Sequence, residues 1–210
     1  MPTPALLKNK AKEIRLSCLK MQHLAHKGHL GGAFSATEIL LGLYYGGVVN
    51  ISPKNFKDPK RDRIIFSKGH ACLSFYAVLA DRGFFSKEEL GKYGKNGSIL
   101  GGHPDHLIPG VEVSSGSLGH GLGIGAGMAL AAKLNNQKYL TYVILGDGEC
   151  NEGSIWEGVA FAVAQNLNNL IAIVDNNGVG ATAKIQNFVG PALMENKWKS
   201  FGWDTLSMDG

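Results

Sequence analysis

The spacing of apolar residues in the first part of the chain predicts helices. Residues 5–27 place Leu, Ile and Ala at roughly helical intervals, which is typical of a long amphipathic helix that ends at Gly28. Ser35 stands three residues before Glu38, a spacing that favours a helix-capping box. We therefore expect a second helix over the apolar positions 39–45.

The middle of the chain changes pattern several times. Residues 63–67 form a short apolar run, which predicts a strand, and a helix is expected from there to about Asp81. Residues 91–121 are rich in Gly, Pro and His, so we expect a long irregular segment, which is more often functional than idle. Residues 118–134 predict a helix with several glycines. Each glycine costs ~1 kcal/mol relative to alanine, which indicates close packing against another backbone.

The clearest pattern lies near the carboxyl end. Residues 139–145 predict an apolar strand, residues 154–165 a helix, and residues 170–174 a second apolar strand. This order is that of a βαβ unit, so we expect the two strands to be parallel and covered on both faces. A further helix over 191–200 and a strand over 203–208 complete the predicted elements.

Length and composition fit one α/β domain over residues 1–210, since 210 residues are short for two domains. Apolar residues make up 44% and charged residues 18%, as in ordinary globular proteins. The 29 glycines favour a backbone that approaches a ligand closely in several loops. The net charge of +4 is mild, and the densest basic stretch, 54–63, also holds Asp58 and Asp62. We therefore expect no nucleic-acid partner.

The cysteines and apolar runs bear on location. Cys18, Cys72 and Cys150 are isolated and lack CxxC spacing, so we predict reduced, semi-buried thiols without a metal or redox role. The N-terminus lacks the regions of a signal peptide, and no apolar run is long enough to span a membrane. We expect a cytoplasmic protein without a membrane partner.

Polar residues follow both strands of the predicted βαβ unit. Ligands of an open α/β sheet bind beyond the carboxyl ends of its strands. Mg²⁺ prefers about six oxygens, often from one or two carboxylates together with phosphate. Asp147 offers a carboxylate, Asn177 an amide oxygen and Val179, just after it, a backbone carbonyl. We predict a metal site here, and a diphosphate bound by backbone N–H groups beside Gly146 and Gly148.

Turn chemistry alone would explain either the GDG or the NN motif by itself. Together, thirty positions apart across a βαβ unit, Gly146-Asp147-Gly148 and Asn176-Asn177 are far more specific and resemble the thiamine-diphosphate signature. A Rossmann fingerprint fits worse, because the GHG at positions 119–121 begins a predicted helix rather than linking a strand to a helix.

Beyond that signature, roughly residues 10–210 resemble the transketolase family. His29, His70 in the sequence SKGH, and His103 before a proline match three histidines that transketolases place around cofactor and substrate. The resemblance implies that His29 and His103 bind the first hydroxyls and carbonyl of the substrate, and that His70 lies near the diphosphate. Imidazole can donate, accept or shuttle a proton near neutral pH. The remaining histidines are interpreted as structural: His23, His26, His106 and His120.

The resemblance implies further site residues. Residues 116–121, GSLGHG, resemble the family's GPLGQG segment and depart from it at the second and fifth positions. Glu152 and Glu157 match the acidic pair that links the two active sites of a transketolase dimer, and we assign Glu152 to the catalytic set with the three histidines. A first-turn acid that favours the helix dipole is a competing interpretation of Glu152. The residues assigned to the cofactor are His70, Gly116, Leu118, Gly146, Gly148, Glu149 and Asn177.

The resemblance also implies an architecture and partners. It implies a three-layer thiamine-diphosphate-binding α/β fold with a mostly parallel sheet flanked by helices. It is closest to the N-terminal subunits of split transketolases, which transfer a two-carbon ketol unit between sugar phosphates with thiamine diphosphate and Mg²⁺, or Ca²⁺ in its place. The glutamate that contacts the aminopyrimidine belongs to a pyrimidine-binding domain. We expect a C-terminal subunit to supply it, in a homodimer or heterotetramer. Family N-terminal halves continue past a segment like 201–210, so we expect a truncated C-terminal end.

Other functions stay open at this point. A 1-deoxyxylulose-5-phosphate synthase is disfavoured by the segment 102–105, GHPD, which looks like transketolase. A pyruvate dehydrogenase alpha subunit would share the GDG and the closing asparagine but not the three histidine motifs. The alternative from another class is a non-catalytic transketolase-like module that serves binding or regulation.

Overall fold

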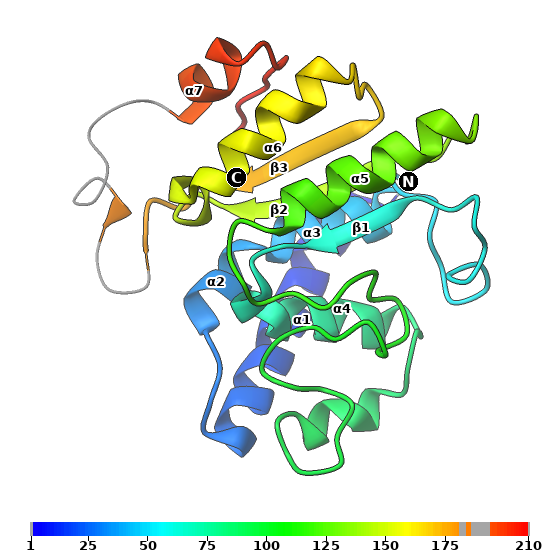
Figure 1. The fold of residues 1–210 in the computed structure, drawn as a ribbon. Coiled ribbons are helices and arrows are strands. Elements are labelled where there is room, and N and C mark those ends of the chain that lie inside the picture. Colours follow the sequence, from blue (N-terminus) through cyan, green and yellow to red (C-terminus); the bar gives the residue numbers. More distant parts are fainter. Residues whose placement is uncertain (1, 181–183, 186–193, 210) are drawn as a thin grey trace.

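A parallel three-stranded sheet forms the centre of the fold. The computed structural model describes residues 2–180, 184–185 and 194–209. The strands β1 (Arg63–Phe66), β2 (Thr141–Gly146) and β3 (Leu170–Asp175) lie in the order β1-β2-β3 (Figure 1). The prediction of two parallel neighbouring strands in the βαβ unit is confirmed by the register, which runs from Thr141 opposite Leu170 to Gly146 opposite Asp175.

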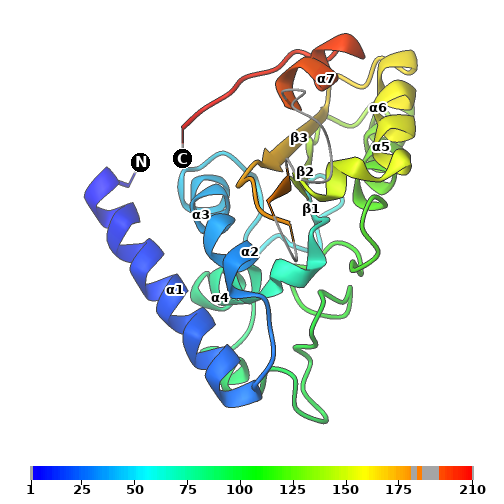
Figure 2. The ribbon, with the colours of Figure 1, turned by 90° about the vertical axis from the view of Figure 1, so that its left-hand side faces the viewer.

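Helices cover both faces of the sheet, so the predicted three-layer α/β architecture is confirmed. Helices α5 and α6 lie on one face, and α2, α3 and α4 lie on the other, with α1 packed outside them (Figure 2). The helices of the described ranges are α1 (Pro4–Ala25), α2 (Leu30–Ser35), α3 (Thr37–Tyr45), α4 (Cys72–Asp81), α5 (Gly121–Leu134), α6 (Gly153–Ala164) and α7 (Met194–Ser200). Short 3₁₀ helices lie at Gly69–Ala71, Lys87–Lys92 and Glu149–Asn151.

The strands divide the apolar core into two parts. Ile64 and Phe66 of β1 pack into a core shared with α1, α3 and α4. Ile65 of β1 and Val143 of β2 pack into a second core shared with α5 and α6. Because successive side chains of a strand point to opposite faces, one apolar run supplies both cores. Because both faces of the sheet are buried, the strands appear in the sequence as continuous apolar stretches.

The glycines of α5 only partly follow the expectation from sequence. A Cβ at Gly125 would lie 2.5 Å from Cγ2 of Val143, and one at Gly121 would lie 2.4 Å from Cβ of Ser67. Gly123 and Gly127 have nothing within 4 Å of such an added atom. The close neighbours are therefore mainly side chains of β2 and of the residue that follows β1, and packing against another backbone is not the general reason for these glycines.

The predicted capping box is wrong. Ser35 is the last residue of α2, and Ala36 is the N-cap of α3 without a side-chain cap hydrogen bond. The Ser35 hydroxyl donates to Oδ2 of Asp175 at 2.6 Å, and Glu38 pairs with Arg15 of α1 at 2.6 Å. Both side chains are therefore engaged by tertiary partners, which leaves neither for the helix end.

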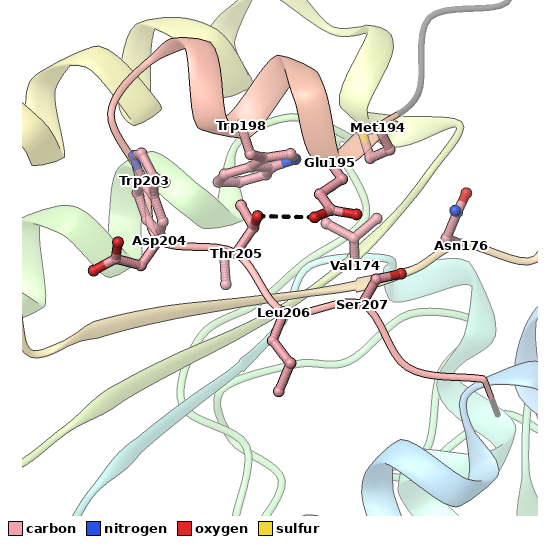
Figure 3. A pocket seen from close by; sticks show the side chains of 11 residues that line it. Val174, Asn176, Met194, Glu195, Trp198, Trp203, Asp204, Thr205, Leu206 and Ser207 are labelled. Carbon is pink, nitrogen blue, oxygen red and sulfur yellow. Dashed lines mark hydrogen bonds between the residues drawn. The ribbon is translucent and has the colours of Figure 1, made fainter.

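The predicted strand over residues 203–208 is also wrong, because that segment has no strand structure. The Trp203 indole N–H donates to the carbonyl oxygen of Val159 on α6, and its ring packs against Trp198 of α7. A hollow of about 240 Å³ lies between this segment, α7 and β3 (Figure 3). Anchored to helices rather than to the sheet edge, the segment adds no strand. The helix expected over 191–200 is described from Met194, and its first three positions lie outside the described residues.

Other expectations can be checked directly. After the 3₁₀ helix that ends at Lys92, the chain has no helix or strand until α5, as predicted for the segment 91–121. Cys18, Cys72 and Cys150 are buried and free of disulfides. Within the described ranges, no helix combines the length and apolar character needed to cross a membrane.

Candidate cofactor site

The loops after β2 and β3 meet at the carboxyl edge of the sheet. The Asp147 N–H donates to the carbonyl oxygen of Asp175 at 3.2 Å. The Asp147 carboxylate accepts from the backbone N–H of Gly148 at 2.8 Å and from that of Gly178 at 2.7 Å. Asp147 is only 2% exposed. The structure thus brings together the two motifs that the sequence analysis paired across the βαβ unit.

The environment of Asp147 fits a divalent cation. Burial raises the pKa of Asp147, and the two N–H donors only partly oppose that effect. Among the described residues, no salt bridge reaches this carboxylate. An adjacent cation would stabilise its charged form. Asn177 and Val179 lie on the exposed loop after β3, and Oδ1 of Asn177 accepts from the Val179 N–H at 2.9 Å.

The donor set is too small for a metal held by protein alone. No group of three or more His, Cys, Asp or Glu side chains suitable for a metal occurs in the described part of the chain. One carboxylate, one amide oxygen and one backbone carbonyl would leave coordination positions for phosphate oxygens and water. This is the pattern of Mg²⁺ held together with a bound diphosphate rather than in a dedicated cage.

Glu149 connects three segments beneath the same edge. It is 2% exposed. Its Oε1 accepts from the Ser67 hydroxyl and from the Gly119 N–H, the latter at 3.0 Å, and its Oε2 accepts from the Gly146 N–H at 3.1 Å. Both oxygens thus accept from protein donors, and the carboxylate positions the loops. Direct contact of Glu149 with the cofactor stays a prediction.

A buried ion pair, which sequence reasoning missed, joins the ends of β1 and β3. Lys68 Nζ lies 2.5 Å from Oδ2 of Asp175, and the two side chains are 2% and 7% exposed. Asp175 also accepts from Ser35 on α2. The sequence signal was available in part, because Lys68 and Asp175 both sit at the carboxyl ends of apolar strands. Their pairing required the strand order.

The three predicted histidines lie in one region. The rings of His29 and His70 pack edge to face with centroids 5.5 Å apart. A Cβ at Gly116 would lie 3.1 Å from Cδ2 of His103, so the loop at Gly116 packs on that ring. Burial, with Lys68, His29 and His103 nearby, lowers the pKa of His70 to about 4. His70 is half-buried and uncharged at neutral pH, whereas His29 and His103 are exposed.

The segment that resembles GPLGQG lines a second hollow. This hollow of about 330 Å³ is bordered by Gly116, Ser117 and His120 at the start of α5. The Leu118 carbonyl oxygen lies 3.1 Å from Nδ1 of His120. Gly116 has a φ of 154°, which glycine adopts more easily than other residues. Gly116 is therefore placed beside an open space, whereas Leu118 does not line it, and contact of either residue with a cofactor stays a prediction.

The predicted acidic residues lie on the surface of α6. Glu152 is the N-cap of this helix, is exposed, and makes no side-chain cap hydrogen bond. Glu157 is exposed on the same helix. A Cβ at Gly119 would lie 2.6 Å from Cβ of Glu152, so the stem of Glu152 packs on the glycine loop. The described contacts link Glu152 to that loop and not to the histidines, and its catalytic role stays a prediction.

Comparison with known proteins identifies the family. Residues 7–210 match the family described as transketolase, thiamine diphosphate binding domain. This chain belongs to that family. The resemblance inferred from the histidine and GDG motifs is thereby confirmed.

Similar proteins include single subunits of transketolases. The chain is 40% identical to one subunit of the apulose-4-phosphate transketolase of Phocaeicola vulgatus, over 97% of this chain and 72% of that protein. It is 38% identical to a 6-deoxy-6-sulfo-D-fructose transketolase subunit of a Clostridium species, over 97% of this chain and 74% of the relative. The resemblance to split N-terminal subunits is confirmed by these matches.

Full-length transketolases share the same domain. The chain is 37% identical to human transketolase over 97% of its own length and 33% of the human protein. The solved transketolase structures of Campylobacter jejuni and Leishmania mexicana superpose with TM-scores of 0.85 and 0.84, each at 27% identity over 96% of this chain. This chain spans 33% and 31% of those two chains, about a third of a complete transketolase. These matches confirm the fold.

Proposed function

We propose that this chain is the diphosphate- and metal-binding subunit of a transketolase that transfers a two-carbon ketol unit between sugar phosphates. The main support is the environment of Asp147. This buried carboxylate accepts from the Gly148 and Gly178 N–H groups at the point where the GDG and NN motifs meet. The similarity to subunits of split transketolases supports the same function.

In this proposal Asp147, the Asn177 amide oxygen and the Val179 carbonyl hold Mg²⁺, which Ca²⁺ can replace, and Gly146 and Gly148 let the backbone approach the diphosphate. When bound, thiamine diphosphate supplies the carbanion chemistry, and the protein binds and orients it. The donor set on this chain therefore secures only one end of the cofactor.

The histidines would act on the sugar. With its pKa near 4, the His70 ring is uncharged at neutral pH, so it can donate one hydrogen bond and accept another. His29 and His103, exposed beside it, would bind the hydroxyl and carbonyl oxygens of the substrate. An imidazole cluster of this kind can move a proton to or from a sugar oxygen.

A C-terminal subunit with the pyrimidine-binding domain completes the proposed enzyme, in a homodimer or heterotetramer. To test this, the chain is mixed with a transketolase C-terminal subunit, thiamine diphosphate and Mg²⁺, and transfer from a ketose phosphate to an aldose phosphate is measured. Transfer supports the proposal. No transfer with a partner that is competent with another N-terminal subunit, together with no cofactor-dependent thermal shift, would refute it and leave the non-catalytic module.

The metal assignment has its own test. Asp147→Ala should abolish metal-dependent binding of thiamine diphosphate, because it removes the only carboxylate of the proposed donor set. Asp105→Ala, at an exposed aspartate in the loop after His103, should leave binding unchanged. Calorimetric titration of both variants measures the affinity, and equal affinity in Asp147→Ala and the parent would exclude this site.

A further inference from the structure

A chain of hydrogen bonds crosses the region below the proposed metal site. Lys68 Nζ lies 2.5 Å from Oδ2 of Asp175. The hydroxyl of Ser35 lies 2.6 Å from the same oxygen, and Nδ2 of Asn177 lies 3.2 Å from Oγ of Ser35. The members come from the ends of β1, β3 and α2 and from the loop after β3. Three segments that are distant in sequence are thereby joined, because Asp175 and Asn177 belong to the same one.

The direction of every bond in this chain is determined by chemistry. An ammonium group only donates and an ionised carboxylate only accepts. Oδ2 of Asp175 lies 2.5 Å from Lys68 Nζ, so this carboxyl oxygen accepts from the ammonium group. Ser35 has one proton, and although the Gly32 carbonyl oxygen is 3.2 Å away, the Asp175 oxygen is nearer, at 2.6 Å. The serine oxygen is then left as an acceptor for Asn177.

This direction decides which way the asparagine amide faces. The –NH₂ end must point to Ser35, because the serine oxygen can only accept there. The amide oxygen is therefore turned away from Ser35 and toward the Val179 N–H, 2.9 Å away. A cation attracts the amide oxygen and repels the –NH₂ group, so an amide already held in this orientation does not have to rotate to bind one.

We propose that Ser35 is a positioning residue for the metal. Its hydroxyl donates to Asp175, which is paired with Lys68, and its oxygen accepts from the Asn177 –NH₂ group, so that the Asn177 amide oxygen faces the cation. We call this series of hydrogen bonds the relay. This inference rests on the proposed function, because it assumes a divalent cation with a diphosphate at Asp147 and Asn177. It assigns Ser35, Lys68 and Asp175 a joint role that none of them has alone.

The relay predicts a difference between two cations. Mg²⁺ demands near-ideal octahedral geometry, whereas Ca²⁺ accepts flexible coordination. Loss of groups that orient metal ligands typically lowers metal affinity by 10–100-fold. Ser35→Ala should therefore raise the Kd for Mg²⁺ in the presence of inorganic pyrophosphate by roughly tenfold, and the Kd for Ca²⁺ by less than about threefold.

Calorimetric titration of the 210-residue chain with pyrophosphate and either cation provides the measurement. Ser35→Thr keeps the hydroxyl and should retain parental affinity to within about twofold. Ser17→Ala removes a serine whose hydroxyl donates to the Glu13 carbonyl oxygen of its own helix, and should change neither affinity. Parental Mg²⁺ affinity in Ser35→Ala, or an equal loss for both cations, would overturn the relay.

Failure of the relay and failure of the proposed function give different results. If the parent binds Mg²⁺ with pyrophosphate and Ser35→Ala binds it with the same affinity, the relay alone is overturned. If Ser35→Ala loses Mg²⁺ affinity as expected but the chain with its partner subunit transfers no ketol unit, the proposed transferase alone is overturned. No binding by the parent overturns both. Should Ser35→Ala not fold, spectra of the parent labelled with ¹⁵N-asparagine decide. A nuclear Overhauser effect between the Asn177 –NH₂ and the Ser35 β-protons is expected, and its absence overturns the relay.

Discussion

Replacing Glu149 with glutamine should lower the free energy of unfolding by about 3 kcal/mol. The carboxylate accepts three hydrogen bonds, from the Ser67 hydroxyl and from the N–H groups of Gly119 and Gly146. In glutamine one oxygen becomes –NH₂, which cannot accept. If the remaining oxygen keeps Ser67 and Gly119, the –NH₂ group faces the Gly146 N–H, donor against donor.

The magnitude follows from the burial of this group. A hydrogen bond to a charged partner contributes ~1.5–3 kcal/mol, and a buried donor without an acceptor costs ~1–3 kcal/mol. The loss of one such bond, together with weakening of the other two, gives the value of about 3 kcal/mol. For a chain of this length that corresponds to a decrease in Tm of roughly 6–12 °C.

Urea unfolding followed by tryptophan fluorescence measures the change. The matched control is Glu157→Gln on the exposed surface of α6, which should stay within about 0.5 kcal/mol of the parent. The m-values should be unchanged, because neither substitution alters the area exposed on unfolding. A Glu149→Gln variant that unfolds within about 0.5 kcal/mol of the parent would refute the role of this carboxylate in joining the loops.

Three further predictions concern separate elements. Stability should fall as the pH decreases from 6.5 toward about 4, because the pKa of His70 is lowered to about 4 in the folded chain, so the unfolded chain takes up the proton first. After screening at this half-buried ring the loss is about 1–2 kcal/mol, and urea titrations that show the same pH slope in the parent and in His70→Asn would contradict it. Tyr76→Phe should speed amide exchange in the His103 loop, because the tyrosine hydroxyl donates to the His103 carbonyl oxygen at 2.7 Å; unchanged exchange would exclude that anchoring role. Gly127→Ala should raise Tm, since nothing lies within 4 Å of the added Cβ and alanine favours a helix by ~1 kcal/mol, whereas Gly125→Ala should lower Tm through contact with a buried strand side chain at 2.5 Å; shifts of the same sign would be inconsistent with the packing of α5.

The elements of this chain could be predicted because their signals are local. The apolar runs at β1, β2 and β3 and the helical spacing of α1 and α6 depend only on which faces are buried. The placement of Asp147 near Asn177 could be predicted as well. Parallel strands joined by one helix end at the same edge, so two short motifs suffice to locate that region.

Local signals failed where distant partners compete. Ser35 and Glu38 have the spacing of a capping box, yet both bond to residues on other elements. The segment 203–208 has a strand-like composition, but its tryptophan is bound to α6 and α7 and not to the sheet edge. In both cases a tertiary partner outweighs a weak local preference.

The order of residues along the chain was enough to establish the family, the three-layer arrangement of the elements and the motifs at the carboxyl edge of the sheet. How the charged and hydroxyl groups beneath that edge are paired became known from the folded chain alone. Ser67 and Glu149 are 82 positions apart, and Ser35 and Asp175 are 140 positions apart. Apolar periodicity reports burial and carries no information about which polar groups meet. Those partners are fixed by strand order and by the need to satisfy every buried charge.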